Sequence, residues 1–206
     1  MGEGIYQVWL GSLSLQEHSF RALDTPDGMT WALLIFVLAS VSKGLSDAGV
    51  MMINRVTKTQ FVRGLFGGPV LLAVVALTWA GCIWLALRGA LGVEVAFERL
   101  LSLVFLSYAP LVLGVFAIIP HAGLLWSLIL RIWMLLITVA GLHQHFQVPL
   151  LYSVAASGVG WLLFQLITEV FRGKYERLRF ALLGRERWVR PKEAAEQLLQ
   201  RRMAGE

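Results

Sequence analysis

Five stretches of about 20 mostly apolar residues constrain this chain more than any other feature. A bilayer core about 30 Å thick needs roughly 20 apolar residues at about 1.5 Å rise each. Inside lipid every backbone polar group must be paired within the segment, and the alternating pattern of a membrane barrel is absent. The sequence therefore predicts an all-α fold, a polytopic membrane helix bundle of about five transmembrane helices. The predicted spans cover residues 29–52, 65–87, 100–119, 123–142 and 149–171.

The composition indicates one membrane domain with few residues left for any other domain. Of the 206 residues 57% are hydrophobic and 15% are charged, whereas soluble domains carry about a quarter charged residues. We divide the chain into an N-terminal segment over 1–28, a transmembrane domain over 29–171 and a tail over 172–206. Residues 1–28 hold more acidic than basic side chains, which is unlike a cleavable signal peptide, so the first span is expected to direct insertion.

The N-terminal segment mixes polar and apolar residues and is expected to lie at the membrane interface. Ser14 and Glu17 have capping-box spacing, which predicts a short helix from there through Leu23. A turn over residues 25–28 would then lead into the first span. The apolar residues that could share one face of this segment are Ile5, Val8, Trp9, Leu13, Phe20 and Leu23.

The positive charges favour a cytoplasmic carboxyl tail. With the amino end outside, three Lys/Arg of the first loop and ten of residues 172–206 lie inside, and only Arg21, Arg88 and Arg99 lie outside. The tail alternates basic and apolar residues, as amphipathic helices that bind anionic lipid do. A lipid surface, a protein partner or a simply solvated tail all fit this pattern, and no nucleic-acid motif accompanies the charge. The candidate lipid or partner surface comprises Arg172, Lys174, Arg177, Arg179, Arg185, Arg187, Trp188 and Arg190.

Ionisable residues inside the spans give the sharpest chemical signal. An unpaired charge near the middle of a span costs several kcal/mol or more, so Arg131 needs protein, water or a carboxylate beside it. We hypothesise a neutral cluster of Lys43, Asp47, Arg131 and Glu169 that joins the first, fourth and fifth helices. The cluster would act as structural glue, or alternatively as a polar path for ions or protons.

Proline and glycine predict irregular helices. Gly67, Gly68 and Pro69 near the start of the second span and Pro110 inside the third should break or kink their helices, and Pro120 closes the third span.

Catalytic signals are absent from the sequence. His143 and His145 have a spacing that can bind a metal, but no neighbouring Cys, Asp or Glu completes a ligand shell. No nucleophile–base arrangement or phosphate-binding glycine loop occurs. We expect no enzymatic activity, no metal and no cofactor.

Several short motifs appear along residues 19–170 in an order that resembles the bacterial branch of the Yip1 family. They are Ser19-Phe20-Arg21-Ala22-Leu23, Phe66-Gly67-Gly68-Pro69, Ser107-Tyr108-Ala109-Pro110, Ile118-Ile119-Pro120, Ile132-Trp133 and Gly141-Leu142. The resemblance implies a five-helix bundle without enzymatic activity in a bacterial cytoplasmic or internal energy-transducing membrane. Eukaryotic members act in vesicle traffic with Rab-type GTPases, but they carry a long cytoplasmic amino-terminal domain that this chain lacks.

Two functional classes follow from these features. The first is a non-catalytic scaffold or accessory subunit of a larger membrane assembly, with a protein partner or a second copy of the chain and anionic lipids as its contacts. The alternative is a small transporter or channel that uses the buried charges and proline-broken helices. Lipid handling at the cytoplasmic leaflet is a third possibility.

Overall fold

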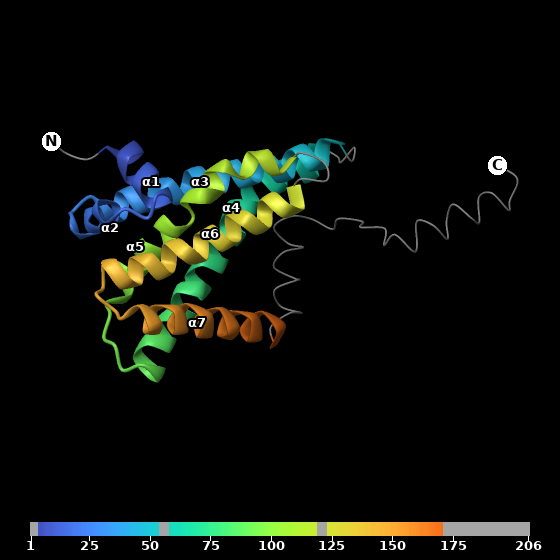
Figure 1. Ribbon diagram of the computed structural model, residues 1–206. Helices are drawn as coiled ribbons and strands as arrows, with labels where there is room; N and C mark the ends of the chain where they lie inside the picture. The colour runs from blue at the N-terminus through green and yellow to red at the C-terminus, as the bar shows by residue number, and fades with distance from the viewer. Residues whose placement is uncertain (1–3, 54–57, 119–122, 171–206) are drawn as a thin grey trace, which may run out of the picture.

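The computed structural model describes residues 4–53, 58–118 and 123–170, and within these ranges the chain is helical without strands. Three short elements come first, and longer helices cross the bundle after them (Figure 1). The elements are α1 (Ile5–Leu13), α2 (Glu17–Arg21), the 3₁₀ turn η1 (Ala22–Asp24), α3 (Gly28–Ile53), α4 (Lys58–Leu85), the π-helical turn η2 (Ala86–Ala90), α5 (Phe97–Ser107), the 3₁₀ helix η3 (Ala109–Ile118), α6 (Gly123–Gln144) and α7 (Leu150–Val170).

Four described stretches are long and apolar enough to cross a membrane: Gly28–Ser46, Gly67–Gly89, Phe97–Phe116 and Leu125–Gln144. The predicted all-α membrane bundle is therefore confirmed. The apolar stretch found in α7, Leu150–Phe164, is shorter than these four, so a fifth span remains a prediction.

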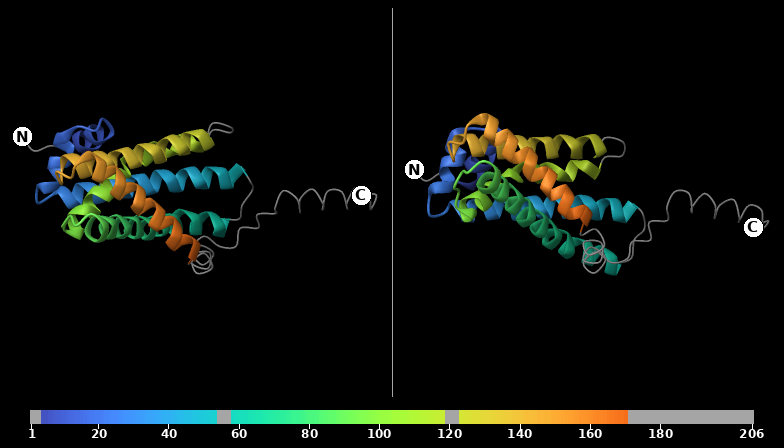
Figure 2. Two further views of the ribbon diagram at one scale, coloured as in Figure 1. Left: turned by 60° about the horizontal axis from the view of Figure 1, so that its bottom comes forward. Right: turned by 90° about the horizontal axis from the view of Figure 1, so that it is seen from below.

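Packing places the broken third span at the centre of the bundle. Helix α3 contacts η3, α4 and α5, whereas α6 contacts η3 and α7. Helix α7 also crosses α4 obliquely (Figure 2). Fully buried side chains such as Ile35, Leu103 and Ile137 fill the interior, and many leucines and valines remain exposed on α3, α4, α6 and α7, as expected for faces that contact lipid.

The third span changes from α to 3₁₀ geometry beside Pro110. Helix α5 ends at Ser107, and η3 begins at Ala109. Proline lacks an N–H and its ring clashes with the carbonyl four residues earlier, so an α-helix cannot continue normally there. In contrast, α4 is not broken at Gly67, Gly68 and Pro69, because it runs from Lys58 to Leu85 with Pro69 in its interior. Pro120 lies outside the described residues.

The N-terminal segment packs over one end of the bundle, the end that also holds the α6–α7 connection (Figure 1). Two of its own side chains, Val8 of α1 and Phe20 of α2, are fully buried. The indole of Trp133 donates to the Leu13 carbonyl at 3.0 Å, and the Gln144 amide donates to the Leu15 carbonyl at 3.4 Å. These bonds join α6 to the segment, which we call the N-terminal cap (residues 4–24).

The predicted start of the second cap helix is wrong. Helix α2 begins at Glu17 after Gln16, which has an extended backbone, and no capping bond from Ser14 forms. Ser14 instead ends α1, and its hydroxyl donates to the Leu10 carbonyl at 3.0 Å. Leu15 then has a φ of 56°, a left-handed conformation that turns the chain between the two helices.

Candidate functional site

The backbone of η3 is held by side chains from three other elements. The Trp9 indole of α1 donates to the Ala109 carbonyl at 3.1 Å, and the Trp126 indole of α6 donates to the Leu113 carbonyl at 3.0 Å. Ser42 of α3 also bonds to the segment. Its hydroxyl donates to the Val112 carbonyl at 2.7 Å and accepts from the Val115 N–H at 3.1 Å.

These bonds explain how a long 3₁₀ segment is tolerated inside a membrane bundle. Runs longer than three or four residues are uncommon because 3₁₀ hydrogen bonds have poorer geometry, and unsatisfied backbone groups are costly in lipid. Tyr108 fixes the junction before η3, because its buried ring makes edge contacts with Phe36 at 5.1 Å and with Trp79 at 6.4 Å. The break is therefore a braced structural joint.

Ser42→Ala is expected to lower the free energy of unfolding by about 1–3 kcal/mol, because it leaves groups of η3 without their side-chain partner. Ser40→Ala is the matched control on the same helix, since among the described residues the Ser40 hydroxyl bonds only to the Phe36 carbonyl of its own helix. Thermal unfolding in one detergent would compare the two variants. Equal losses would contradict the bracing role of Ser42.

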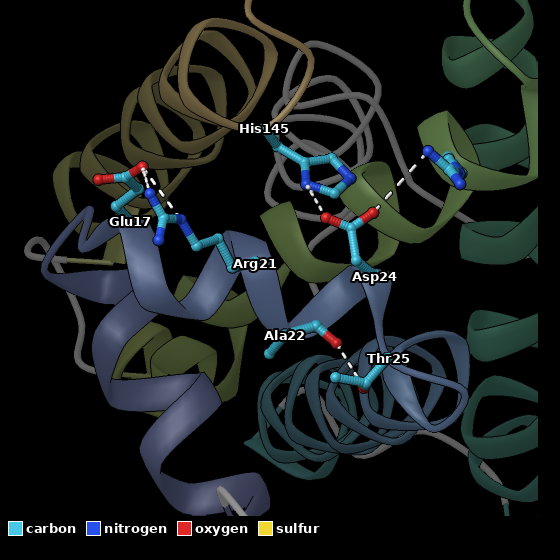
Figure 3. A network of polar contacts seen from close by, with 7 residues as sticks. Glu17, Arg21, Ala22, Asp24, Thr25 and His145 are labelled. Carbon is cyan, nitrogen blue, oxygen red and sulfur yellow. Dashed lines mark hydrogen bonds and ion pairs between the residues drawn. The ribbon is translucent and has the colours of Figure 1, made fainter.

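A second group of polar side chains lies at the capped end of the bundle. Asp24 of η1 lies between an imidazole and a guanidinium from distant parts of the chain (Figure 3). Its Oδ2 is 3.5 Å from Nδ1 of His145, in the α6–α7 connection, and its Oδ1 is 3.9 Å from an Arg99 nitrogen of α5. Asp24 and Arg99 are more than half exposed, but the His145 side chain is only 2% exposed. This cluster ties the cap to two other elements.

Other charges at this end are also engaged. Arg21 and Glu17 pair at 2.6 Å along α2 (Figure 3). Arg88 lies over the Trp84 ring at 5.2 Å, beside a cavity lined by Arg88, Glu94, Val95 and Ala96. The capped end therefore exposes charges of both signs, namely those of Glu17, Arg21, Asp24, Arg88, Glu94 and Arg99.

Acidification is expected to loosen the cap through His145. Burial lowers the pKa of His145. The Asp24 carboxylate raises this pKa and the Arg99 cation lowers it, but the net result is a pKa below the usual value. A histidine with a lowered pKa binds fewer protons when docked. The contribution of the docked His145 to the free energy of unfolding is therefore complete above the unfolded pKa of about 6.5. This contribution is lost as the pH falls below that value.

The measurement is the thermal midpoint between pH 8 and pH 5. We expect the wild-type midpoint to fall on acidification and that of His145→Asn to fall less. A wild type that is more stable at pH 5, or two identical slopes, would contradict this assignment.

The predicted intramembrane cluster is only partly described. Arg131 has an exposed side chain on α6, and Lys43 is half-buried on α3 next to Ser42. Asp47 and Glu169 lie on the described helices α3 and α7, but their side chains lie outside the described residues. The cluster therefore stays a prediction, as does the basic surface of residues 172–190, which lies entirely outside the described residues.

His143, in the last turn of α6, and His145, in the α6–α7 connection, have separate contacts. His143 Nδ1 lies 2.9 Å from the Val148 carbonyl, whereas His145 faces Asp24. Among the described residues, no group of three His, Cys, Asp or Glu side chains could hold a metal ion.

The residues that brace η3 could not be identified from the sequence. The indoles of Trp9 and Trp126 and the hydroxyl of Ser42 bond to backbone atoms, and such bonds leave no spacing motif. The available signal was Pro110, which frees backbone groups that must find partners nearby.

Comparisons with known proteins gave no relative. No family model matches the chain, and neither the curated proteins nor the solved structures gave a match.

Proposed function

We propose that this protein is a non-catalytic, Yip1-like scaffold or accessory subunit of a larger membrane assembly. The observation that carries the proposal is that side chains of the same chain form hydrogen bonds with the backbone of η3, where the third span is broken. Trp9, Ser42 and Trp126 pair with η3 carbonyls inside the fold. A solute path would instead use freed backbone groups of a broken helix to bind its cargo. The joint therefore favours a structural role over a transport role.

Two polar surfaces remain for contacts with other molecules. The capped end exposes charges of both signs, including Glu17, Arg21, Asp24 and Arg99. The sequence adds the basic tail of residues 172–206, which we assign to the cytoplasmic side of a bacterial membrane. Such a tail suits a partner or an anionic leaflet, and we propose that it is the main contact with the assembly.

The test is purification from native membranes in mild detergent with an affinity tag after residue 206. We expect a partner protein to co-purify in fixed stoichiometry. When the tag is moved to the partner, this chain should co-purify with it. Deletion of residues 172–206 should release it. A matched variant with glutamine at Arg172, Lys174, Arg177, Arg179, Arg185, Arg187 and Arg190 would separate loss of charge from loss of the segment. A chain that purifies alone from every membrane preparation would contradict the proposal.

The alternative is a small transporter or channel, and one observation favours it. A 3₁₀ segment interrupts a membrane-length stretch and passes the backbone of Lys43 at Gly114. Interrupted helices are common at transport sites. Saturable flux of an ion or small solute into reconstituted vesicles would support this reading. We then expect Ser42→Ala to change the flux more than Ser40→Ala.

A further inference from the structure

Arg131 is a membrane-embedded cation on the outer face of the bundle. It lies beside Leu128 and Ile132 of α6, which are 54% and 51% exposed, whereas Leu130 and Met134 point into the core. Its guanidinium makes no hydrogen bond or ion pair with any residue that the structure describes. Arg131 therefore needs a partner from outside the described fold.

The depth of Arg131 in the membrane limits what that partner is. The residue follows Gly123, the first residue of α6, by eight positions, which places its Cα about 12 Å along the helix axis. Side chains on a helix tilt toward its N-terminal end, and a long arginine side chain can extend along apolar surface to bring its charge to the interface. The guanidinium is thus directed toward the headgroups at the N-terminal end of α6.

The surface around Arg131 is apolar. Leu128, Ile132 and Leu136 follow one another at four-residue spacing and are all exposed, so they form a continuous stripe along α6. A stripe of this kind fits a hydrocarbon chain that runs from the interface toward the middle of the bilayer. The cation at its side fits an anionic headgroup.

We propose that Arg131 and this stripe bind one anionic phospholipid, with the phosphate paired to the guanidinium and an acyl chain along Leu128, Ile132 and Leu136. Guanidinium matches phosphate in a two-bond, charge-assisted geometry. The pairing removes the cost of an unpaired charge in the membrane. A carboxylate on a neighbouring membrane helix would have to lie at the depth of the Arg131 Cα, inside the bilayer. A lipid phosphate lies at the headgroup level, toward which the guanidinium is directed. The site does not depend on the proposed accessory role.

The first experiment counts lipids bound to the full chain by native mass spectrometry. Phosphatidylglycerol and phosphatidylcholine would be titrated into wild type, Arg131→Gln, Arg131→Lys and Arg88→Gln. Arg88→Gln is the control because it removes the same charge from the exposed η2 turn, which ends a different membrane-length stretch, Gly67–Gly89. We expect Arg131→Gln to lose one phosphatidylglycerol molecule, or to bind it at least about tenfold more weakly, because charge-assisted bonds contribute roughly 1.5–3 kcal/mol. Arg131→Lys should keep the molecule but bind it less tightly, because an ammonium keeps the charge and loses the two-bond geometry. Arg88→Gln should bind as wild type does.

A second experiment uses wild type alone, so it does not depend on the folding of any variant. A phosphatidylglycerol with a photoreactive group in its acyl chain should label the peptide that contains Leu128, Ile132 and Leu136. Excess unlabelled phosphatidylglycerol should suppress the labelling, and excess phosphatidylcholine should not. Equal competition by both lipids, labelling confined to other helices, or unchanged lipid counts in Arg131→Gln would overturn the proposal. Loss of a bound protein from Arg131→Gln with unchanged lipid binding would assign the residue to a helix–helix contact instead.

Discussion

Phe20→Ala is expected to lower the free energy of unfolding by about 3–5 kcal/mol, the range for removal of a buried aromatic ring from a packed core. The Phe20 ring is fully buried where the N-terminal cap meets the bundle. The cap is short, since α2 spans only five residues, so little else would close the cavity. We expect the variant to expose the cap to proteolysis at temperatures where the transmembrane helices remain intact.

The matched control for Phe20 is Tyr6→Ala in the same segment. Tyr6 is 64% exposed, although its ring contacts Trp9, and surface substitutions usually change stability by about 0.5 kcal/mol or less. Thermal unfolding and limited proteolysis of both variants would be compared in one detergent. If the two variants lost similar stability, the cap would not be docked on the bundle as described.

Gly160→Val is expected to cost about 3 kcal/mol, at the upper end of the overpacking range. A Cβ at residue 160 would lie 2.7 Å from Ile83 Cγ1 and only 3.1 Å from the Ile83 Cα. Because backbone of α4 is among these atoms, a side-chain rotation cannot relieve the contact, and α7 must move away from α4. Small residues commonly allow such close approach between membrane helices.

Gly158→Val is the control for Gly160, two residues away on the same helix. A Cβ there meets nothing within 4 Å, and the change in helix propensity is the same at both positions. Thermal unfolding should show a large loss for Gly160→Val and a small one for Gly158→Val. A greater loss for Gly158→Val would contradict the α4–α7 packing.

The helical architecture could be predicted because the thickness of the bilayer sets the number of consecutive apolar residues in a membrane-spanning helix. The predicted first span of residues 29–52 matches α3, and the fourth of residues 123–142 matches α6 to within two residues. Helix α4 begins at Lys58, seven residues before the predicted second span. A helix can continue beyond its apolar part, and hydropathy does not detect that extension.

The candidate site was harder to predict because its bonds join distant parts of the chain. Pro110 predicted a break or kink, but the three-sided support from Trp9, Ser42 and Trp126 depends on helix packing. Asp24, Arg99 and His145 likewise meet only when the cap folds over the bundle. A hydroxyl or an indole is common in any membrane helix, so its partner cannot be read from local sequence.

The most direct test of the accessory role is the mass of the intact particle excised from native membranes with polymer rather than detergent. The chain itself has a mass of 22.9 kDa. We expect a particle that contains this chain and a different protein in fixed ratio, with the second protein absent after deletion of residues 172–206. A particle that contains this chain alone, as a single copy or as a homo-oligomer, and that supports saturable flux in vesicles would contradict the account and favour transport.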